Sequence, residues 1–280
     1  ALADLINDFS IGATDLHQDT AVYKPNPFYK SNIGSVSAIT NDEGLYLVDG
    51  GEANQNLPLS PMTIPERQVD ILFAFDNSAN TGDDWPNGES LVATYERQFM
   101  NQGNGTAFPY VPDVNSFRNL NLTQRPAFFG CNAKNLTGLV QDADAVYDIP
   151  LVVYIANRPV SYQSNKNTLK LAYTDSEKIS MVKNGFEVSS RNNHEYDSEW
   201  AACVGCAIIR REQERSGAEQ SDQCKQCFQK YCWDGLLDPV AKSFTFTDDG
   251  GVSNADNTPY SSSKLNSTAP YSNSTTSSFI

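Results

Sequence analysis

The chain has 280 residues, of which 39% are hydrophobic, and this supplies enough apolar material for a sizeable buried core. Its 34 acidic residues outnumber its 20 basic residues and give a net charge of −14 with both histidines neutral. A surface this acidic repels phosphate groups over most of its area, which argues against nucleic-acid binding. The sequence also predicts no transmembrane segment, because no apolar run approaches the roughly 18 residues that a spanning helix needs.

Short apolar runs separated by loops make up the first part of the chain. Residues 2–8 have helical apolar spacing and predict a short amphipathic helix. Prolines and aromatic residues interrupt any period over residues 10–41, which predicts a long surface loop. The apolar run 45–48 ends abruptly at the Asp-Gly-Gly triplet 49–51, the pattern of a buried strand that enters a tight turn.

Two further buried strands are predicted at residues 69–75 and 149–156. Both runs are short, continuous and rich in β-branched or aromatic side chains. Helical patterns cover residues 89–101 and 176–186, the second with apolar residues at 179, 182 and 186. Continuous strands separated by helices are typical of a sheet that is covered on both faces, so the predicted fold class is α/β.

A helical hairpin and a polar tail are predicted for the last third of the chain. Residues 197–215 and 221–233 have helical patterns and are joined by a short polar stretch. Residues 249–280 consist mainly of Ser, Thr, Asn and Gly, too little apolar material to offset the entropy lost on ordering. We therefore expect a folded domain over residues 1–248 and a mobile, glycosylated tail over residues 249–280.

Asp49 is the first candidate for chemistry. A carboxylate at a strand end, followed by Gly50 and Gly51, can lie close to a partner and leaves room for a substrate. For an isolated Asp-Gly-Gly triplet, a simple turn is the alternative interpretation. The two histidines, His17 and His194, are far apart and belong to no motif, so we interpret them as surface or packing residues.

Polar residues near the second predicted strand are further candidates. Residues 76–78 (Asp-Asn-Ser) follow that strand, at the kind of position where the sites of α/β proteins gather, and Asn77 is the candidate substrate contact. Arg67 precedes the strand. It is placed either to reach a substrate phosphate or, as we favour, to form an ion pair with Glu66 or Asp70.

Five Asn-x-Ser/Thr sequons favour a secreted or cell-wall-associated glycoprotein, as does the low charged fraction of 19%. The sequon asparagines are Asn104, Asn121, Asn135, Asn266 and Asn273. The chain begins at Ala1 without an initiator Met or a signal region. This start indicates either that processing removed an N-terminal segment or that the chain is a piece of a longer precursor.

A dense series of motifs connects these candidates. Residues 47–59 read Leu-Val-Asp-Gly-Gly-Glu-Ala-Asn-Gln-Asn-Leu-Pro-Leu, followed by Pro-Glu-Arg-Gln-Val-Asp-Ile at 65–71, Phe-Asp-Asn-Ser-Ala at 75–79 and Asp-Trp-Pro-Asn-Gly at 84–88. The run resembles the C-terminal half of the fungal lysophospholipases, also called phospholipases B. The resemblance extends to Cys-Val-Gly-Cys at 203–206 and Cys-Lys-Gln-Cys-Phe at 224–228, and so covers most of residues 1–248.

This resemblance implies a patatin-like, cytosolic-phospholipase-like sheet and the hydrolysis of acyl esters of lysophospholipids and phospholipids, without a cofactor. Such enzymes use a Ser-Asp dyad, and the aspartate of their motif matches Asp49. A serine hydroxyl is a weak nucleophile, so a carboxylate must accept its proton during attack on the ester. Asp49 is then the general base, and Gly50, Gly51 and Asn77 lie on the substrate side.

The chain departs from the family pattern at the nucleophile. It contains no Gly-x-Ser-x-Gly turn, and the segment 34–38 (Gly-Ser-Val-Ser-Ala) has its serines at the wrong offsets. In the family, the nucleophile, the oxyanion-hole glycines and a phosphate-facing arginine lie upstream of the position of Ala1. We therefore expect the N-terminal half of the same enzyme as a partner and no activity from this chain alone. A non-enzymatic secreted binding module and another patatin-type acyl hydrolase remain alternatives.

The six cysteines allow two interpretations. They are Cys131, Cys203, Cys206, Cys224, Cys227 and Cys232. The two Cys-x-x-Cys pairs have the spacing of a four-cysteine zinc site, but they lie in helical patterns, and the sequons favour an oxidising compartment. On facing antiparallel helices, Cys203 can pair with Cys227 and Cys206 with Cys224. This leaves Cys131 and Cys232 for each other or for the missing half, and we favour disulfides with no bound metal.

Overall fold

The computed structural model describes residues 21–32 and 37–242. The predicted helix at residues 2–8, the predicted tail at residues 249–280, His17, and the sequons at Asn266 and Asn273 lie outside the described residues. The chain divides into two compact units between Asn54 and Gln55. Each unit is described by itself.

The first unit is a two-stranded ribbon. Strand β1 (Ala21–Tyr23) pairs antiparallel with β2 (Leu45–Leu47), and a one-turn helix, α2 (Ser37–Thr40), lies between them in the chain. Asn26 holds the connection together: its Nδ2 donates to the carbonyls of Ile39 and Asp42, at 2.6 Å and 2.8 Å. The prediction of one continuous loop over residues 10–41 is therefore wrong at β1 and α2.

The predicted strand at residues 45–48 is present as β2, but its predicted burial is wrong. Tyr46 is 58% exposed, Leu47 44% and Val48 68%. The reason lies in the pairing, because β1, to which β2 is bonded, is itself exposed at all three residues.

The second unit contains a mixed sheet with strand order β3-β5-β4. Strands β3 (Ile71–Asp76) and β5 (Leu151–Ala156) are parallel, and β4 (Ala127–Phe129) is antiparallel to β5. All six residues of β5 are buried, as its continuous apolar sequence predicts. In β3 the burial alternates, and Phe73 and Phe75 are 38% and 45% exposed. The expectation of a sheet covered on both faces thus holds for β5 and fails on one face of β3, which lies at the edge of this sheet.

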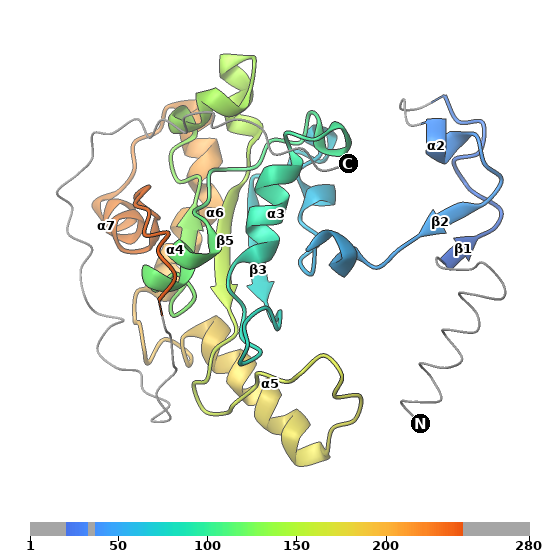
Figure 1. Ribbon diagram of the computed structural model, residues 1–280. Helices are drawn as coiled ribbons and strands as arrows, with labels where there is room; N and C mark the ends of the chain where they lie inside the picture. The colour runs from blue at the N-terminus through green and yellow to red at the C-terminus, as the bar shows by residue number, and fades with distance from the viewer. Residues whose placement is uncertain (1–20, 33–36, 243–280) are drawn as a thin grey trace. The chain divides into compact units, whose positions relative to one another are not determined.

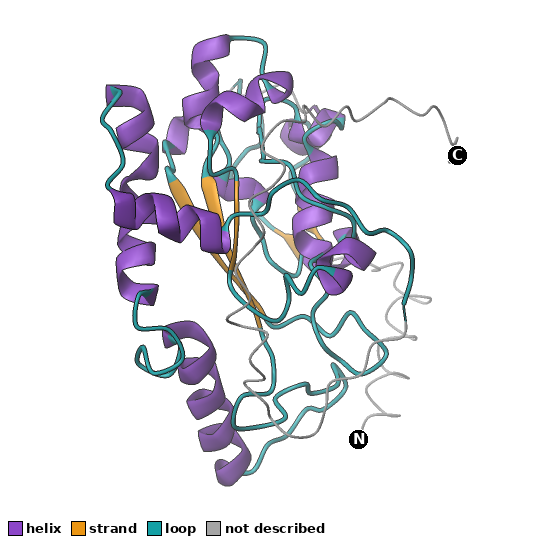
Figure 2. Cartoon of the chain, turned by 90° about the vertical axis from the view of Figure 1, so that its left-hand side faces the viewer, coloured by secondary structure: helices purple, strands orange, loops and turns teal. Residues whose placement is uncertain are grey.

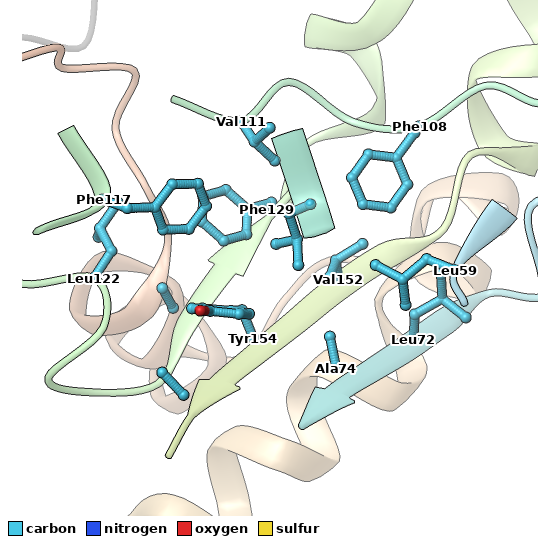
Figure 3. Close-up of a cluster of buried hydrophobic side chains, with 13 residues drawn as sticks. Leu59, Leu72, Ala74, Phe108, Val111, Phe117, Leu122, Phe129, Val152 and Tyr154 are labelled. Carbon is cyan, nitrogen blue, oxygen red and sulfur yellow. The ribbon is translucent and has the colours of Figure 1, made fainter. Parts of the chain in front are cut away.

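Helices pack on both faces of the sheet (Figure 1). Helices α3 (Glu89–Arg97) and α4 (Val114–Asn119) contribute to the core on one face. Phe117 packs there against Phe129 and Tyr154 (Figure 3), and its ring centroid lies 5.4 Å from each of theirs. This arrangement requires a glycine at position 88, where φ is +83° and an added Cβ would lie 2.6 Å from the Phe117 ring.

The other face is covered by α6 (Trp200–Ser216) and α7 (Asp222–Tyr231), the predicted helical hairpin. Trp200, Phe128 and Tyr231 form an aromatic group across this interface, and Phe128 stacks on Tyr231 at 5.2 Å. Six short 3₁₀ segments complete the secondary structure of the described residues: Gly50–Ala53, Ser60–Met62, Pro65–Arg67, Asn101–Gly103, Ala133–Leu139 and Ala143–Asp148.

Helix α5 (Asp175–Ser190) confirms the helix predicted at residues 176–186, and its packing shows which of its faces is inside. It begins with a capping box in which Thr174 and Glu177 satisfy each other's backbone N–H groups. The buried residues of α5 are Asn184, Glu187 and Val188. The apolar residues at 179, 182 and 186 are all exposed, so the apolar periodicity marks the outer face of this helix.

Three disulfides join the six cysteines: Cys131–Cys232, Cys203–Cys227 and Cys206–Cys224. The two pairings predicted between the facing helices are confirmed, and the remaining two cysteines pair with each other. The zinc alternative loses its ligands, because these four sulfurs are bonded in pairs and a zinc site needs thiolates.

Removing Cys131–Cys232 should cost the most stability of the three. This bond closes a loop of 101 residues, against 24 and 18 for the others. Loop-closure entropy then gives about 4.7 kcal/mol for the long loop and about 3 kcal/mol for each short one. Urea unfolding of the three paired Cys→Ala variants measures this order. The order would be contradicted if the variant that lacks the long-loop disulfide were no less stable than the other two.

The unmodified chain should contain no free thiol by labelling and no stoichiometric zinc by elemental analysis.

A buried arginine braces the loop between β4 and β5. Arg211, on α6, is fully buried, and its guanidinium donates to the carbonyls of Ile149 and Gly130, both at 2.6 Å. It also pairs with Glu214 at 2.6 Å, and Glu214 accepts from the backbone N–H of Ala133. Burial lowers the pKa of Arg211, although Glu214 opposes the shift. The guanidinium thus links both ends of the loop to α6.

Candidate functional site

Asp49 caps a short helical turn directly after β2. Its Oδ1 accepts a hydrogen bond from the backbone N–H of Gly51 at 2.7 Å, which makes Asp49 the N-cap of the 3₁₀ segment Gly50–Ala53. The side chain is exposed, and the turn ends at Asn54 in the left-handed region. The bond to Gly51 orients one carboxylate oxygen and leaves the group at the surface of its unit.

The parallel strands β3 and β5 end together in the second unit, and their carboxyl ends carry polar residues. Asp76, the last residue of β3, is buried and accepts from the hydroxyl of Tyr154 at 2.7 Å and from the N–H of Ser78 at 3.0 Å. Burial and the neighbouring carboxylate raise the pKa of Tyr154 well above its ordinary value, so the phenol stays protonated as a donor. Asp76 therefore ties β3 to β5.

Asn77 differs from its two neighbours, because it is exposed while Asp76 and Ser78 are buried. Of the residues 76–78, only the predicted substrate contact thus presents its side chain to solvent. Asn77 belongs to the second unit and Asp49 to the first.

Asn184 organises the loop that follows β5. It is fully buried on α5, and its Oδ1 accepts from the backbone N–H groups of Val160 and Ser161 at 2.9 Å and 3.1 Å. Its Nδ2 donates to the carbonyl of Arg158 and to the Ser164 hydroxyl, both at 2.9 Å. One amide side chain thus holds the backbone at the carboxyl end of the sheet in a single arrangement.

The other polar candidates lie apart from these groups. Asp70, suggested as an ion-pair partner of Arg67, instead binds Arg215 through two hydrogen bonds of 2.7 Å and 2.6 Å. His194 is exposed, as its surface interpretation predicts. Within the described residues, no group of three or more His, Cys, Asp or Glu side chains is arranged to hold a metal ion.

Comparison with known proteins identifies the family to which the chain belongs. A family described as "Lysophospholipase catalytic domain" matches residues 1–238. The chain belongs to the lysophospholipase catalytic-domain family. "Lysophospholipase 1" of Candida albicans is 54% identical over 268 residues, which is 94% of this chain and 42% of the relative. "Lysophospholipase 1" of Saccharomyces cerevisiae is 49% identical over 251 residues, 89% of this chain and 37% of the relative.

This lysophospholipase-family chain thus spans about two fifths of the length of the curated relatives it matches. No solved structure matches it significantly. The resemblance stated from the motifs at residues 47–88 is confirmed by these relatives. Among the described residues, no helix is both long and apolar enough to cross a bilayer.

The sequence does not predict several of the polar contacts at the carboxyl ends of β3 and β5. Asn184 gives no signal in a single sequence, because an asparagine inside a helix is ordinarily an exposed residue. The sequence pattern places Tyr154 in a buried strand but does not indicate which residue accepts the hydrogen bond that a buried tyrosine hydroxyl needs. Its acceptor, Asp76, lies 78 residues earlier in the chain.

Proposed function

We propose that the complete protein containing this chain hydrolyses acyl esters of lysophospholipids and phospholipids, and that Asp49 is the general base. The observation that carries the proposal is the family match over residues 1–238, within which Asp49 follows a strand in an Asp-Gly-Gly turn. The relatives named above are called lysophospholipases, and the proposal extends this activity to the complete protein.

In the proposed reaction, a serine hydroxyl attacks the ester carbonyl while Asp49 accepts its proton. The tetrahedral intermediate collapses as Asp49 returns the proton to the leaving glycerol oxygen, and an acyl-serine remains. Water, deprotonated by the same carboxylate, then attacks the acyl-serine. The bond between the acyl carbon and the serine oxygen breaks as Asp49 returns the proton to that oxygen, and the free fatty acid leaves. The hydrogen bond from Gly51 fixes one oxygen of Asp49, and the other oxygen is the proton acceptor.

We propose that the N-terminal half of the same enzyme supplies the serine. Two observations support a missing neighbour for the second unit. Strand β3 lies at the edge of its three-stranded sheet although it is paired in parallel, and parallel strands are ordinarily covered on both faces. Phe73 and Phe75 are exposed on that strand. An added strand would pair with the β3 backbone, and its side chains on the same face would pack beside both rings, as expected if the complete sheet is patatin-like.

The isolated 280-residue chain should show no lysophospholipid hydrolysis, and activity should appear when the complete protein is expressed. The chain supplies the base but no serine in a nucleophile turn. Fatty-acid release is measured on purified chain and on complete protein, with the folded state of each checked by circular dichroism. Sustained turnover by the chain alone would show that the nucleophile has been misplaced. An inactive complete protein would favour the binding-module alternative.

We also propose that the protein is secreted or cell-wall associated and carries N-linked sugar on at least two of Asn104, Asn121 and Asn135. All three side chains are exposed, as glycan acceptors must be in the folded protein. Glycosidase treatment of protein from its native host should lower its mass, and the Asn→Gln variants of at least two of these sites should each lack the mass of one glycan. A mass unchanged by the enzyme would remove both the glycan and the secretion arguments.

A further inference from the structure

Helix α5 carries an unpartnered apolar face on the side opposite its buried residues. Ile179, Val182 and Phe186 are 70%, 74% and 54% exposed, and their spacing of three and four residues places them in one row. Figure 2 shows α5 as the lowest helix, with no described helix or strand along its outer side. Large apolar side chains gathered this way mark an interaction surface.

The segment before the helix carries exposed apolar residues of its own. Leu169 and Leu171 are 66% and 70% exposed. Lys170, between them, forms an ion pair with Glu177 in the first turn of α5 at 2.5 Å, which fixes the segment beside the helix. We call the row of Ile179, Val182 and Phe186 on the helix the α5 stripe.

Lysines border the stripe on both sides. Lys178 is four residues before Val182, and Lys183 is four residues after Ile179, so each lies next to the row on the helix surface. Their side chains are 60% and 66% exposed. The partner of Lys178 is the exposed Asp175, so this ammonium group can exchange its partner for a phosphate at little cost, whereas Lys183 pairs with the buried carboxylate of Glu187.

The charge of this region is opposite to that of the whole chain. Residues 166–183 contain four lysines and two acidic residues, a local charge of +2, whereas the chain carries −14. An apolar row flanked by lysines is the pattern of a helix that lies in a lipid interface, with its apolar side chains among the acyl chains and its ammonium groups at the phosphates. The local excess of positive charge comes from Lys166 and Lys170 before the helix together with Lys178 and Lys183 in it, and these are the groups that can face phosphates.

Helix α5 lies at the carboxyl end of the sheet in the second unit. Its inner side carries Asn184, which anchors the loop after β5, and Figure 1 shows the helix beyond the carboxyl ends of β3 and β5. We infer that the α5 stripe is the surface through which the protein binds the lipid aggregate that holds its substrate. The inference rests on the proposed function for the identity of the lipid, and it goes beyond that function in assigning the binding surface.

A protein partner fits this face less well than a lipid surface. The exposed edge of β3 has unpaired strand backbone and calls for another strand. Helix α5 has its backbone bonded internally, and its two flanking lysines would each need a matched carboxylate in a protein partner. A lipid surface supplies phosphates at any position along the helix, so no matched partner is required.

The test is co-sedimentation of the 280-residue chain with phosphatidylcholine vesicles, without and with phosphatidylglycerol. We expect binding to both, and a loss of about tenfold or more in the triple variant Ile179→Gln, Val182→Gln, Phe186→Gln. Glutamine is a good helix former, so α5 should persist, and circular dichroism checks this. The matched control is a second triple variant, Leu236→Gln, Leu237→Gln, Val240→Gln. These residues lie outside α5 and are 48%, 49% and 67% exposed, and this variant should bind vesicles as the unmodified chain does.

A second variant separates the lysines from the apolar row. Lys178→Gln with Lys183→Gln should weaken binding to the phosphatidylglycerol vesicles and leave binding to phosphatidylcholine alone nearly unchanged. Equal binding by the triple variant and the unmodified chain would overturn the inference, as would an equal loss in the control. A triple variant that stops the complete protein from folding would also overturn it, because the stripe would then be covered by protein. Vesicle binding is measured without turnover, so it can succeed or fail independently of the proposed hydrolysis.

Discussion

The complete protein with Asp49→Asn should be folded and should lose at least about a thousandfold in kcat for lysophospholipid hydrolysis. An amide cannot accept the serine proton, so the attacking oxygen stays a hydroxyl. The fold should tolerate the change for a local reason. The amide oxygen of asparagine can accept the hydrogen bond from the N–H of Gly51, and asparagine is as good an N-cap as aspartate.

The matched control for this variant is Glu52→Gln, in the same helical turn. Glu52 is an exposed carboxylate two residues after Gly50, and it has no role in the proposed proton transfer. The control should hydrolyse substrate at the unmodified rate. Fatty-acid release is followed at saturating substrate, with thermal melts of both variants to establish that they are folded. A folded Asp49→Asn protein that keeps more than a few per cent of its activity would reject Asp49 as the base.

The Arg211→Met substitution should destabilise the chain by about 3–5 kcal/mol, one of the largest effects available to a single change. Methionine fills much of the arginine volume but donates no hydrogen bond. The carbonyls of Ile149 and Gly130 and the carboxylate of Glu214 then lose their buried partner. For a chain of this size, such a loss lowers Tm by about 10 °C, which calorimetry measures directly.

Arg215 offers a control one turn further along α6. It also binds a carboxylate through two hydrogen bonds, but Arg215 and Asp70 are 36% and 34% exposed in their side chains. Solvent screens such a pair, so Arg215→Met should cost about 1 kcal/mol or less. Equal losses of Tm in the two variants would show that burial does not set the strength of the Arg211 network.

Patterns with a local cause were predictable from the sequence. The continuous apolar run of β5 specifies a strand buried on both faces, and the two Cys-x-x-Cys helices specify their own disulfide partners through i, i+3 spacing. The Asp-Gly-Gly triplet likewise predicts the turn in which Asp49 lies, because a short acceptor side chain before two glycines favours an N-cap.

The sequence predicts less well which residues are buried and which elements pack against one another, because both depend on distant parts of the chain. The apolar sequence of β2 suggests an interior strand, yet β2 is bonded to an exposed three-residue strand. The apolar period of α5 suggests an inward face, yet the inward face carries Asn184 and Glu187. In each case a period reports which residues share a face, and only the neighbouring elements decide which way that face points.

The disulfides are nested: Cys206–Cys224 lies inside the loop of Cys203–Cys227, and both lie inside the loop of Cys131–Cys232. A single protease cut anywhere between residues 131 and 232 therefore leaves both products covalently joined. The exposed segment around Leu169 and Leu171 falls within this range. Nicking there would change the connectivity of the chain without releasing a fragment, so β4, β5, α6 and α7 would stay within reach of one another, and the cut would become visible only after reduction.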